Sequence, residues 1–227
     1  MTPAAPSAAT PAPRLPLGST PRLTQLKAQP RKPGEASFFF FDAHFRNEAV
    51  KVLPGEFFVH DEDILITTTL GSCIAACLWD REKRVGGMNH FMLPDGAGGV
   101  GEASGRYGAF AMDQLIGELV KRGANRSTME AKVFGGGAVI EGMNTINIGE
   151  RNTQFVMEYL RTERITVVSK DVMDIYPRKV CYLPASGKAM VKRLAPAHAD
   201  ALVAQDRLAQ QKAVAPAGGA GGSVDLF

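Results

Sequence analysis

The 227-residue chain contains only three cysteines, and no apolar run in it approaches the length of a membrane-spanning helix. So few cysteines in a chain this long are typical of a reducing compartment, where thiols stay unpaired. A transmembrane helix needs roughly 18 consecutive apolar residues, and a signal peptide needs an apolar centre that the proline-broken N-terminus does not provide. We therefore expect a cytoplasmic protein with no membrane insertion.

A strong excess of positive charge is also missing from most of the chain. The whole chain carries a net charge of +3, whereas residues 1–35 carry five basic residues and one acidic residue, a net of +4. The difference, +3 minus +4, leaves −1 for the remainder. A nucleic-acid-binding protein concentrates positive charge on its folded domain, so we expect no nucleic-acid partner.

Aromatic residues are absent from residues 1–35, which contain eight of the fourteen prolines. Such a composition buries too little apolar surface to offset the entropy of ordering, so it predicts a disordered extension over residues 1–35. Residues 205–227 are rich in alanine and glycine and predict a flexible tail. The stretch between them, residues 36–204, is long enough for one domain with a single core.

Apolar patterning within residues 36–204 predicts both strands and helices. Two helices are expected, one over residues 107–122 with Gly123 as its stop, the other over residues 148–164 with Asn147 as its N-cap. The expected strands cover residues 50–53, 64–67, 73–79, 129–134, 165–168, 180–183 and 189–191, with a further strand that carries His90. The four phenylalanines 38–41 open the ordered part and favour core packing. Elements in this order predict an α+β domain in which mixed β-sheet layers pack against helices.

Cys73 and His90 have the chemistry of a nucleophile and its base. A cysteine attacks only as the thiolate, which a neighbouring imidazole stabilises. The charged turn 80–84 separates the strand after Cys73 from the segment that carries His90, and a hairpin of this kind brings residues equidistant from the turn together. The alternative from these residues alone is a core thiol and a hydrogen-bonded buried histidine, since unpaired cysteines are often buried.

Glycines surround the candidate nucleophile. Gly71 and Ser72 allow a tight turn just before Cys73, which leaves room for substrate and directs backbone N–H groups at a developing oxyanion. Gly135 and Gly136 follow a predicted strand and lack the pattern of a nucleotide-binding loop. We therefore expect Gly71, Ser72, Gly135 and Gly136 to line the substrate site.

A metal site built from Cys73, Cys77, Cys181 and His90 is the other alternative for these residues. Structural zinc sites use ligands in closely spaced pairs, and a Cys-x-x-x-Cys spacing with one distant histidine lacks that pattern. Cys77 and Cys181 each lie within an apolar run, which favours a packing role. We expect no metal and no cofactor.

Two segments resemble motifs of a known family. Residues 66–78 contain Thr67, Gly71, Ser72 and Cys73 in a Thr-x-x-x-Gly-Ser-Cys block, and residues 86–94 contain a His-x-Met-Leu-Pro block that begins at His90. Both blocks resemble CheD, the chemoreceptor glutamine deamidase family of chemotaxis. Further similarity covers residues 107–119, 131–136, 147–149 and 178–180, so it extends over about residues 45–195. The family carries a Gly-Gly pair where this chain has residues 173–177, which predicts a loop of different shape.

The resemblance implies a function and a fold. It implies Cys73 as nucleophile, His90 as general base and Thr67 as the third catalytic residue. It also implies hydrolysis of glutamine side chains in the cytoplasmic helical region of methyl-accepting chemotaxis receptors, which fits a shallow site, and a fold similar to that of the cytotoxic necrotizing factor deamidases. A transglutaminase acting through the same thioester is an alternative. A binding adaptor for a CheC-type phosphatase is another, and such a phosphatase is also a possible partner of an active enzyme.

Overall fold

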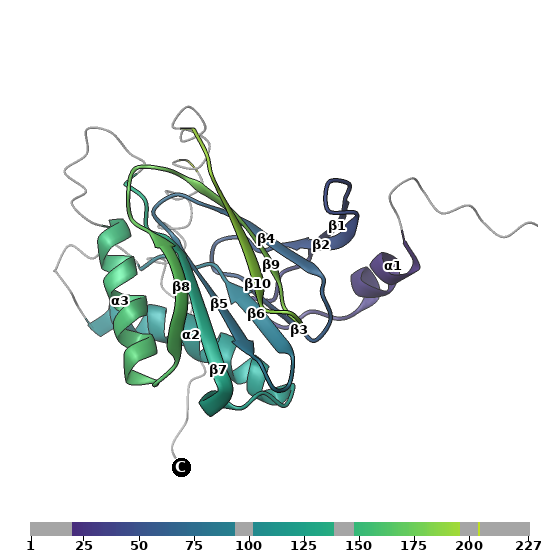
Figure 1. Cartoon of the computed structure of the whole chain (residues 1–227), viewed down its shortest axis with the longest axis horizontal. Helices are drawn as coiled ribbons and strands as arrows, with labels where there is room; N and C mark the ends of the chain where they lie inside the picture. Colours follow the sequence, from purple (N-terminus) through teal and green to yellow (C-terminus); the bar gives the residue numbers. More distant parts are fainter. Residues whose placement is uncertain (1–19, 94–101, 139–147, 196–203, 205–227) are drawn as a thin grey trace, which may run out of the picture.

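Two five-stranded β-sheets stack face to face, and two helices cover the outer face of one of them (Figure 1). The computed structural model describes residues 20–93, 102–138, 148–195 and 204. In chain order the elements are α1 (Pro21–Ala28), β1 (Phe38–Asp42), β2 (Asn47–Lys51), β3 (Phe57–His60), β4 (Leu65–Leu70), β5 (Ile74–Asp80), β6 (Val85–Asn89), α2 (Glu102–Lys121), β7 (Met129–Gly135), α3 (Ile148–Thr162), β8 (Thr166–Val172), β9 (Arg178–Leu183) and β10 (Lys188–Arg193).

The first sheet has the strand order β1-β2-β4-β9-β10, and the second has the order β3-β6-β5-β7-β8. Both are mixed: β2 and β4 run parallel, as do β7 and β8, while the other neighbours are antiparallel. The expected α+β class with mixed sheet layers is therefore confirmed.

Alternation of side chains along the central strand creates two buried layers. On β5, Ile74, Ala76 and Leu78 face α2 and α3, whereas Ala75 and Cys77 face the first sheet. Because successive strand residues point to opposite faces, a strand covered on both sides reads as a continuous apolar run. The buried strand expected over residues 73–79 is confirmed, displaced by one residue.

The expected helices and strands correspond to observed elements with shifts of up to five residues at their ends, and β1 and β3 are additional strands. Gly123 follows α2 with a φ of +92°, the left-handed conformation of a helix stop. The expected cap Asn147 and the expected tail 205–227 lie outside the described residues. In the part of the chain that the structure describes, no helix is long and apolar enough to cross a membrane.

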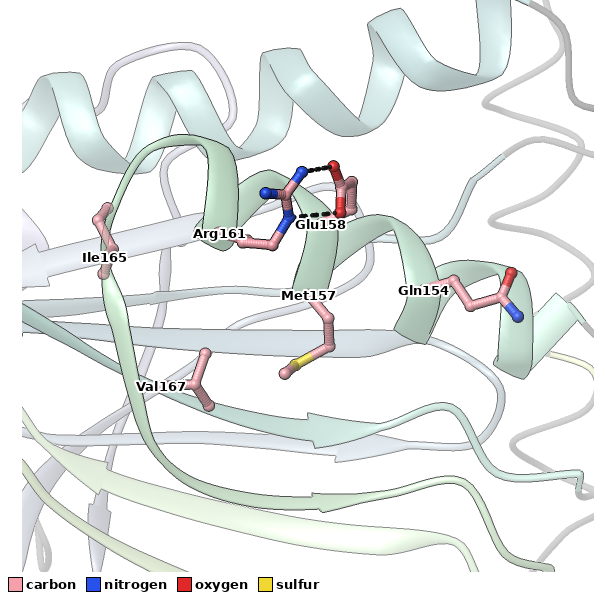
Figure 2. Close-up of a pocket in the computed structure, with 6 residues that line it drawn as sticks. All are labelled: Gln154, Met157, Glu158, Arg161, Ile165 and Val167. Atoms are coloured by element: carbon pink, nitrogen blue, oxygen red, sulfur yellow. Dashed lines mark hydrogen bonds and ion pairs between the residues drawn. The ribbon is translucent and has the colours of Figure 1, made fainter.

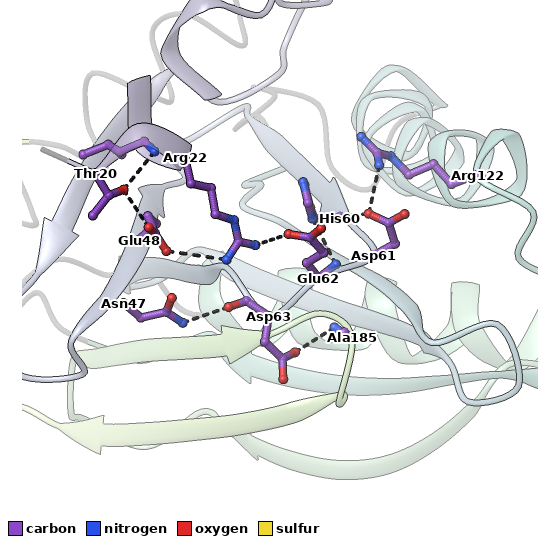
Figure 3. Close-up of polar contacts among 11 residues, drawn as sticks. Thr20, Arg22, Asn47, Glu48, His60, Asp61, Glu62, Asp63, Arg122 and Ala185 are labelled. Atoms are coloured by element: carbon purple, nitrogen blue, oxygen red, sulfur yellow. Dashed lines mark hydrogen bonds and ion pairs between the residues drawn. The ribbon is translucent and has the colours of Figure 1, made fainter. Parts of the chain in front are cut away.

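The predicted disorder of residues 1–35 is wrong for residues 20–35. Thr20 caps α1 by accepting a hydrogen bond from Leu23 N–H at 3.0 Å, and its hydroxyl donates to Glu48 on β2 at 2.6 Å (Figure 3). Leu23 and Leu26 are only 2% and 4% exposed, and both pack into the layer between the sheets. Two leucines on one helix face thus supply the apolar anchor that the average composition hid. The domain begins at least 16 residues before the predicted boundary at residue 36.

Candidate active site

A β-hairpin carries the candidate nucleophile and base. Strands β5 and β6 pair antiparallel across the turn after Asp80, and the register of Cys77 with Met88 continues to a bridge between Ile74 and Phe91. In this register His90 lies opposite Ala75, and Cys73 is the diagonal neighbour of His90 on the same face. Diagonal neighbours have Cβ atoms roughly 7–8 Å apart or less, within reach of long side chains. The expected convergence of Cys73 and His90 at one end of the sheet is confirmed.

Hydrogen bonds hold both the backbone and the imidazole of His90. Its backbone N–H donates to Glu56 at 2.9 Å, and its carbonyl accepts from Gly55 N–H at 2.7 Å. Its Nδ1 lies 2.8 Å from Oγ1 of Thr68, which comes from β4 in the first sheet. The Thr68 hydroxyl donates its single proton to the Val52 carbonyl at 2.7 Å, so towards His90 it can only accept. The proton of neutral His90 therefore lies on Nδ1, which leaves Nε2 as the basic nitrogen.

Thr67, the third residue that the resemblance implies, does not contact His90. On β4 the buried residues Ile64, Ile66 and Leu70 point between the sheets, and Thr68 shares their parity. Thr67 points to the opposite face, where its Oγ1 lies 3.7 Å from the thiol of Cys181. Because a one-residue shift reverses the face of a strand, the structure brings Thr68 rather than Thr67 to His90.

The glycine segments brace the backbone of the candidate nucleophile Cys73. Gly136 N–H donates to the carbonyl of Cys73 at 2.8 Å, and Gly137 N–H donates to that of Gly71 at 2.9 Å. A Cβ on Gly135 would lie 2.1 Å from the Cys73 carbonyl oxygen, so no larger residue fits there. Gly135 and Gly136 therefore act on the position of Cys73, and the Gly136 N–H is already engaged rather than available to substrate.

The loop of residues 173–177 docks on the end of β7 and the residues that follow it. Met173 N–H donates to Gly135 at 2.8 Å, and Ala138 N–H donates to Asp174 at 2.7 Å. Met173 and Asp174 have φ angles of +65° and +66°, which are left-handed conformations that favour glycine. This loop thus adopts glycine-like backbone conformations without glycine.

Sequence reasoning missed Asn152. This residue lies on α3, is fully buried, and contacts the backbone on both sides of the candidate site through its side-chain amide. It occupies the apolar face of the helix with Gly149, Val156 and Leu160. The sequence places this polar residue on an apolar helix face. That position could have indicated a specific role, because a buried amide needs specific hydrogen-bond partners.

The three cysteines differ in their surroundings, and none forms a disulfide. Burial raises the pKa of the Cys77 thiol and, to a smaller extent, that of Cys181. Burial, with a further contribution from the nearby Cys73, also raises the pKa of the Tyr107 phenol on α2. Among the described residues, no group of three or more histidine, cysteine or acidic side chains is arranged to hold a metal ion.

Cys73 and His90 are 0% and 1% exposed, so the expectation of a shallow site is wrong. A pocket of about 210 Å³ is lined by Gly55, Tyr107 and the exposed Phe110, among other residues. A larger pocket of about 650 Å³ lies between α3 and β8 (Figure 2). It contains no cysteine or histidine, and its charged pair Glu158 and Arg161 bond to each other. Of these two pockets, the smaller one is connected to His90, through the hydrogen bond that Gly55 donates to the His90 carbonyl.

A thiol, an imidazole with its basic nitrogen defined, and a hydroxyl that orients the imidazole form the set of groups that cysteine-dependent acyl transfer requires. The candidate nucleophile and base come from one hairpin, whereas the hydroxyl that contacts the imidazole comes from the facing sheet. The class that this site defines is a candidate cysteine hydrolase or acyltransferase.

Comparison with known proteins identifies the family. The family model described as "CheD chemotactic sensory transduction" matches residues 92–193. "Probable chemoreceptor glutamine deamidase CheD 1" of Albidiferax ferrireducens is 60% identical over 210 residues, covering 92% of this chain and 88% of that protein. "Probable chemoreceptor glutamine deamidase CheD" of Bordetella petrii is 53% identical, covering 82% and 86% of the two chains. The chain belongs to the CheD family.

The model match begins after Cys73 and His90, whereas a match that covers 92% of the chain extends to the hairpin that bears them. Among solved structures, the hypothetical protein YfiH of Bacillus licheniformis is 14% identical, with a TM-score of 0.30 over 52% of this chain and 49% of that one. A similarity this weak does not define the fold.

Proposed function

We propose that this protein is a protein-glutamine deamidase that converts glutamines of methyl-accepting chemotaxis receptors to glutamate, with release of ammonia. Relatives that are 60% and 53% identical carry the name chemoreceptor glutamine deamidase, and this similarity is the main support for the reaction and the substrate. The receptor region implied by the family is helical and cytoplasmic, so we also propose that the protein acts in the cytoplasm.

The single observation that carries the mechanism is the contact of Thr68 with His90 at 2.8 Å, because it leaves Nε2 as the base. In the proposed first step His90 takes the thiol proton, and the Cys73 sulfur forms a bond to the amide carbon of the glutamine. The resulting oxyanion is held by backbone N–H groups, with that of Cys73 as the first candidate. The carbon–nitrogen bond then breaks as His90 returns the proton to the nitrogen, and ammonia leaves.

The second half of the reaction regenerates the enzyme. Water attacks the thioester while His90 removes its proton, the carbon–sulfur bond breaks, and the thiol is protonated again. The product is a glutamate side chain. We propose that Gly71 and Ser72, which directly precede Cys73, line the substrate site. Gly135 and Gly136 support the scheme through the Cys73 backbone.

Two further proposals follow from the family resemblance. One is a fold shared with the cytotoxic necrotizing factor deamidases, which the stacked mixed sheets with helices on one face support. The other is a CheC-type phosphatase as a partner. An adaptor without activity would not need a thiol, an imidazole and an orienting hydroxyl together, which favours the enzyme over the adaptor.

Mass spectrometry of a purified receptor cytoplasmic fragment tests the proposed reaction. Incubation with the protein should add about 1 Da at particular glutamines, with stoichiometric ammonia, and a primary amine such as putrescine should not be incorporated. Incorporation of the amine would identify a transglutaminase instead. An unchanged receptor mass in the presence of folded protein, with a catalytically active CheD relative as positive control, would favour the adaptor.

A further inference from the structure

The amide of Asn152 connects the two segments that carry the candidate nucleophile and base. Its Nδ2 donates to the Ser72 carbonyl at 2.8 Å, and its Oδ1 accepts from Leu93 N–H at 2.9 Å. Ser72 precedes Cys73 directly, and Leu93 lies three residues after His90. Because the side chain is 0% exposed, both bonds are made in a dry environment where leaving either group unpaired would be costly.

The position of Asn152 relative to the hairpin gives this contact its significance. Ladder hydrogen bonds hold the two strands together as far as Ile74 and Phe91, whose N–H groups each donate to the other's carbonyl at 2.9 Å. Cys73 lies one residue beyond this pair on one strand, and Leu93 lies two residues beyond it on the other. The Asn152 side chain bonds to both strands past their last mutual bridge.

We propose that Asn152 is a positioning residue that sets the separation between the Cys73 sulfur and the His90 imidazole. This inference rests on the proposed function, in which Cys73 and His90 are the nucleophile and base. An amide is suited to the task because it offers one donor and one acceptor on a rigid plane. Proton transfer from sulfur to nitrogen depends steeply on distance, so a displacement of about 1 Å can lower the rate roughly 100-fold.

Replacement of Asn152 tests this role. Asn152→Ala removes both bonds, whereas Asn152→Asp keeps the acceptor for Leu93 but places an ionised oxygen against the Ser72 carbonyl at neutral pH. Both variants should lower kcat by roughly 10–100-fold and change KM by less than about threefold, since substrate contacts remain. The pH midpoint of Cys73 alkylation should also rise by about one unit, because a displaced imidazole stabilises the thiolate less.

A matched control separates positioning from general stability. Asp80 is likewise buried and accepts hydrogen bonds from three backbone N–H groups, but it lies at the far end of β5 from Cys73. Asp80→Asn should lower the melting temperature yet keep the kcat and the alkylation midpoint of the parent protein when assayed well below that temperature. If Asn152 contributes only to stability, its variants should likewise have a lower melting temperature and an unchanged kcat and alkylation midpoint.

The possible outcomes are distinct. If Asn152→Ala does not fold, Asn152→Asp decides the question through the same measurements on its folded fraction. Unchanged kcat and an unchanged alkylation midpoint in a folded Asn152 variant would overturn the positioning role, provided that Cys73→Ala is inactive. If Cys73→Ala is itself active, the proposed function fails, and the positioning role fails with it. Reduced kcat together with a raised midpoint is the result we expect.

Discussion

The hydroxyl of Thr68 lies 2.8 Å from Nδ1 of His90 and donates at 2.7 Å to the carbonyl of Val52, so it bridges the imidazole to the facing sheet. This arrangement fixes both the tautomer and the orientation of His90. It also makes the candidate site dependent on the packing of the two sheets, because His90 follows β6 of one sheet and Thr68 belongs to β4 of the other.

Replacement of Thr68 should therefore reduce activity more than replacement of its neighbour. Thr68→Val keeps the shape but removes the acceptor, which frees the imidazole to adopt the other tautomer, so we expect kcat to fall by about tenfold or more. Thr67→Val is the matched control, because the Thr67 side chain faces Cys181 instead. Deamidation kinetics of the two variants provide the measurement. A larger loss for Thr67→Val would restore the assignment that the resemblance implied.

Removal of the His90 imidazole should lower kcat more than replacement of Thr68. In His90→Ala the thiol loses its proton acceptor and the leaving nitrogen loses its proton donor, so we expect kcat to fall by roughly 100-fold or more while the fold is kept. Far-ultraviolet circular dichroism should confirm folding, and ammonia release should report turnover. Near-normal turnover in a folded His90→Ala protein is incompatible with the proposed mechanism.

The N-terminal helix should contribute to stability. Leu23→Ala and Leu26→Ala each remove a buried side chain from the layer between the sheets, which typically costs about 2–5 kcal/mol of unfolding free energy. Gln25→Ala on the exposed face is the control and should change the free energy of unfolding by less than about 0.5 kcal/mol. Urea denaturation measures all three. Equal midpoints for the three variants would show that α1 does not pack in solution.

Stability should fall in acid partly through Asp80. Burial acts to raise the pKa of this carboxyl, but hydrogen bonds from the backbone of Asn125, Lys83 and Glu82 outweigh it and lower the pKa below its usual value. A lowered pKa in the folded state contributes stability above the unfolded value of about 4, and this contribution disappears as the pH falls through the folded value. Asp80→Asn should therefore be less stable than the parent at pH 7 and lose less stability between pH 5 and pH 2. An identical acid dependence in the two proteins would exclude this contribution.

Local sequence patterns predicted the hairpin that carries Cys73 and His90. Contacts between residues distant in sequence determine which other side chains lie next to these two residues. Cys73 and His90 could be brought together from the sequence because the apolar run and the charged turn between them define one hairpin. The choice between Thr67 and Thr68 could not be made in this way, since both lie in a run of three threonines and the face of β4 depends on pairing with distant strands. Only the packing of the two sheets determines which hydroxyl reaches His90.

Helix α1 and the role of Asn152 were not predicted from the sequence, for two different reasons. Helix α1 was missed because the proline content of residues 1–35 was averaged, although Thr20 as N-cap, Pro21 at the first helical position and two leucines three residues apart form a helix start. Asn152 stood on an apolar face, but its partners at Ser72 and Leu93 are about 80 and 59 residues away in sequence. No local pattern specifies contacts over such separations.

The most direct test of the account is the order in which the three cysteines react with iodoacetamide near neutral pH, read by peptide mapping after brief labelling. By exposure alone Cys181, at 5%, should react before Cys73, at 0%, so preferential labelling of Cys73 requires chemical activation together with local opening. We predict that Cys73 is labelled first, that deamidation is lost in proportion, and that Cys73→Ala is folded and inactive while Cys77→Ala and Cys181→Ala stay active. If Cys77 or Cys181 is labelled first, or if Cys73→Ala still converts glutamine to glutamate, Cys73 is not the nucleophile.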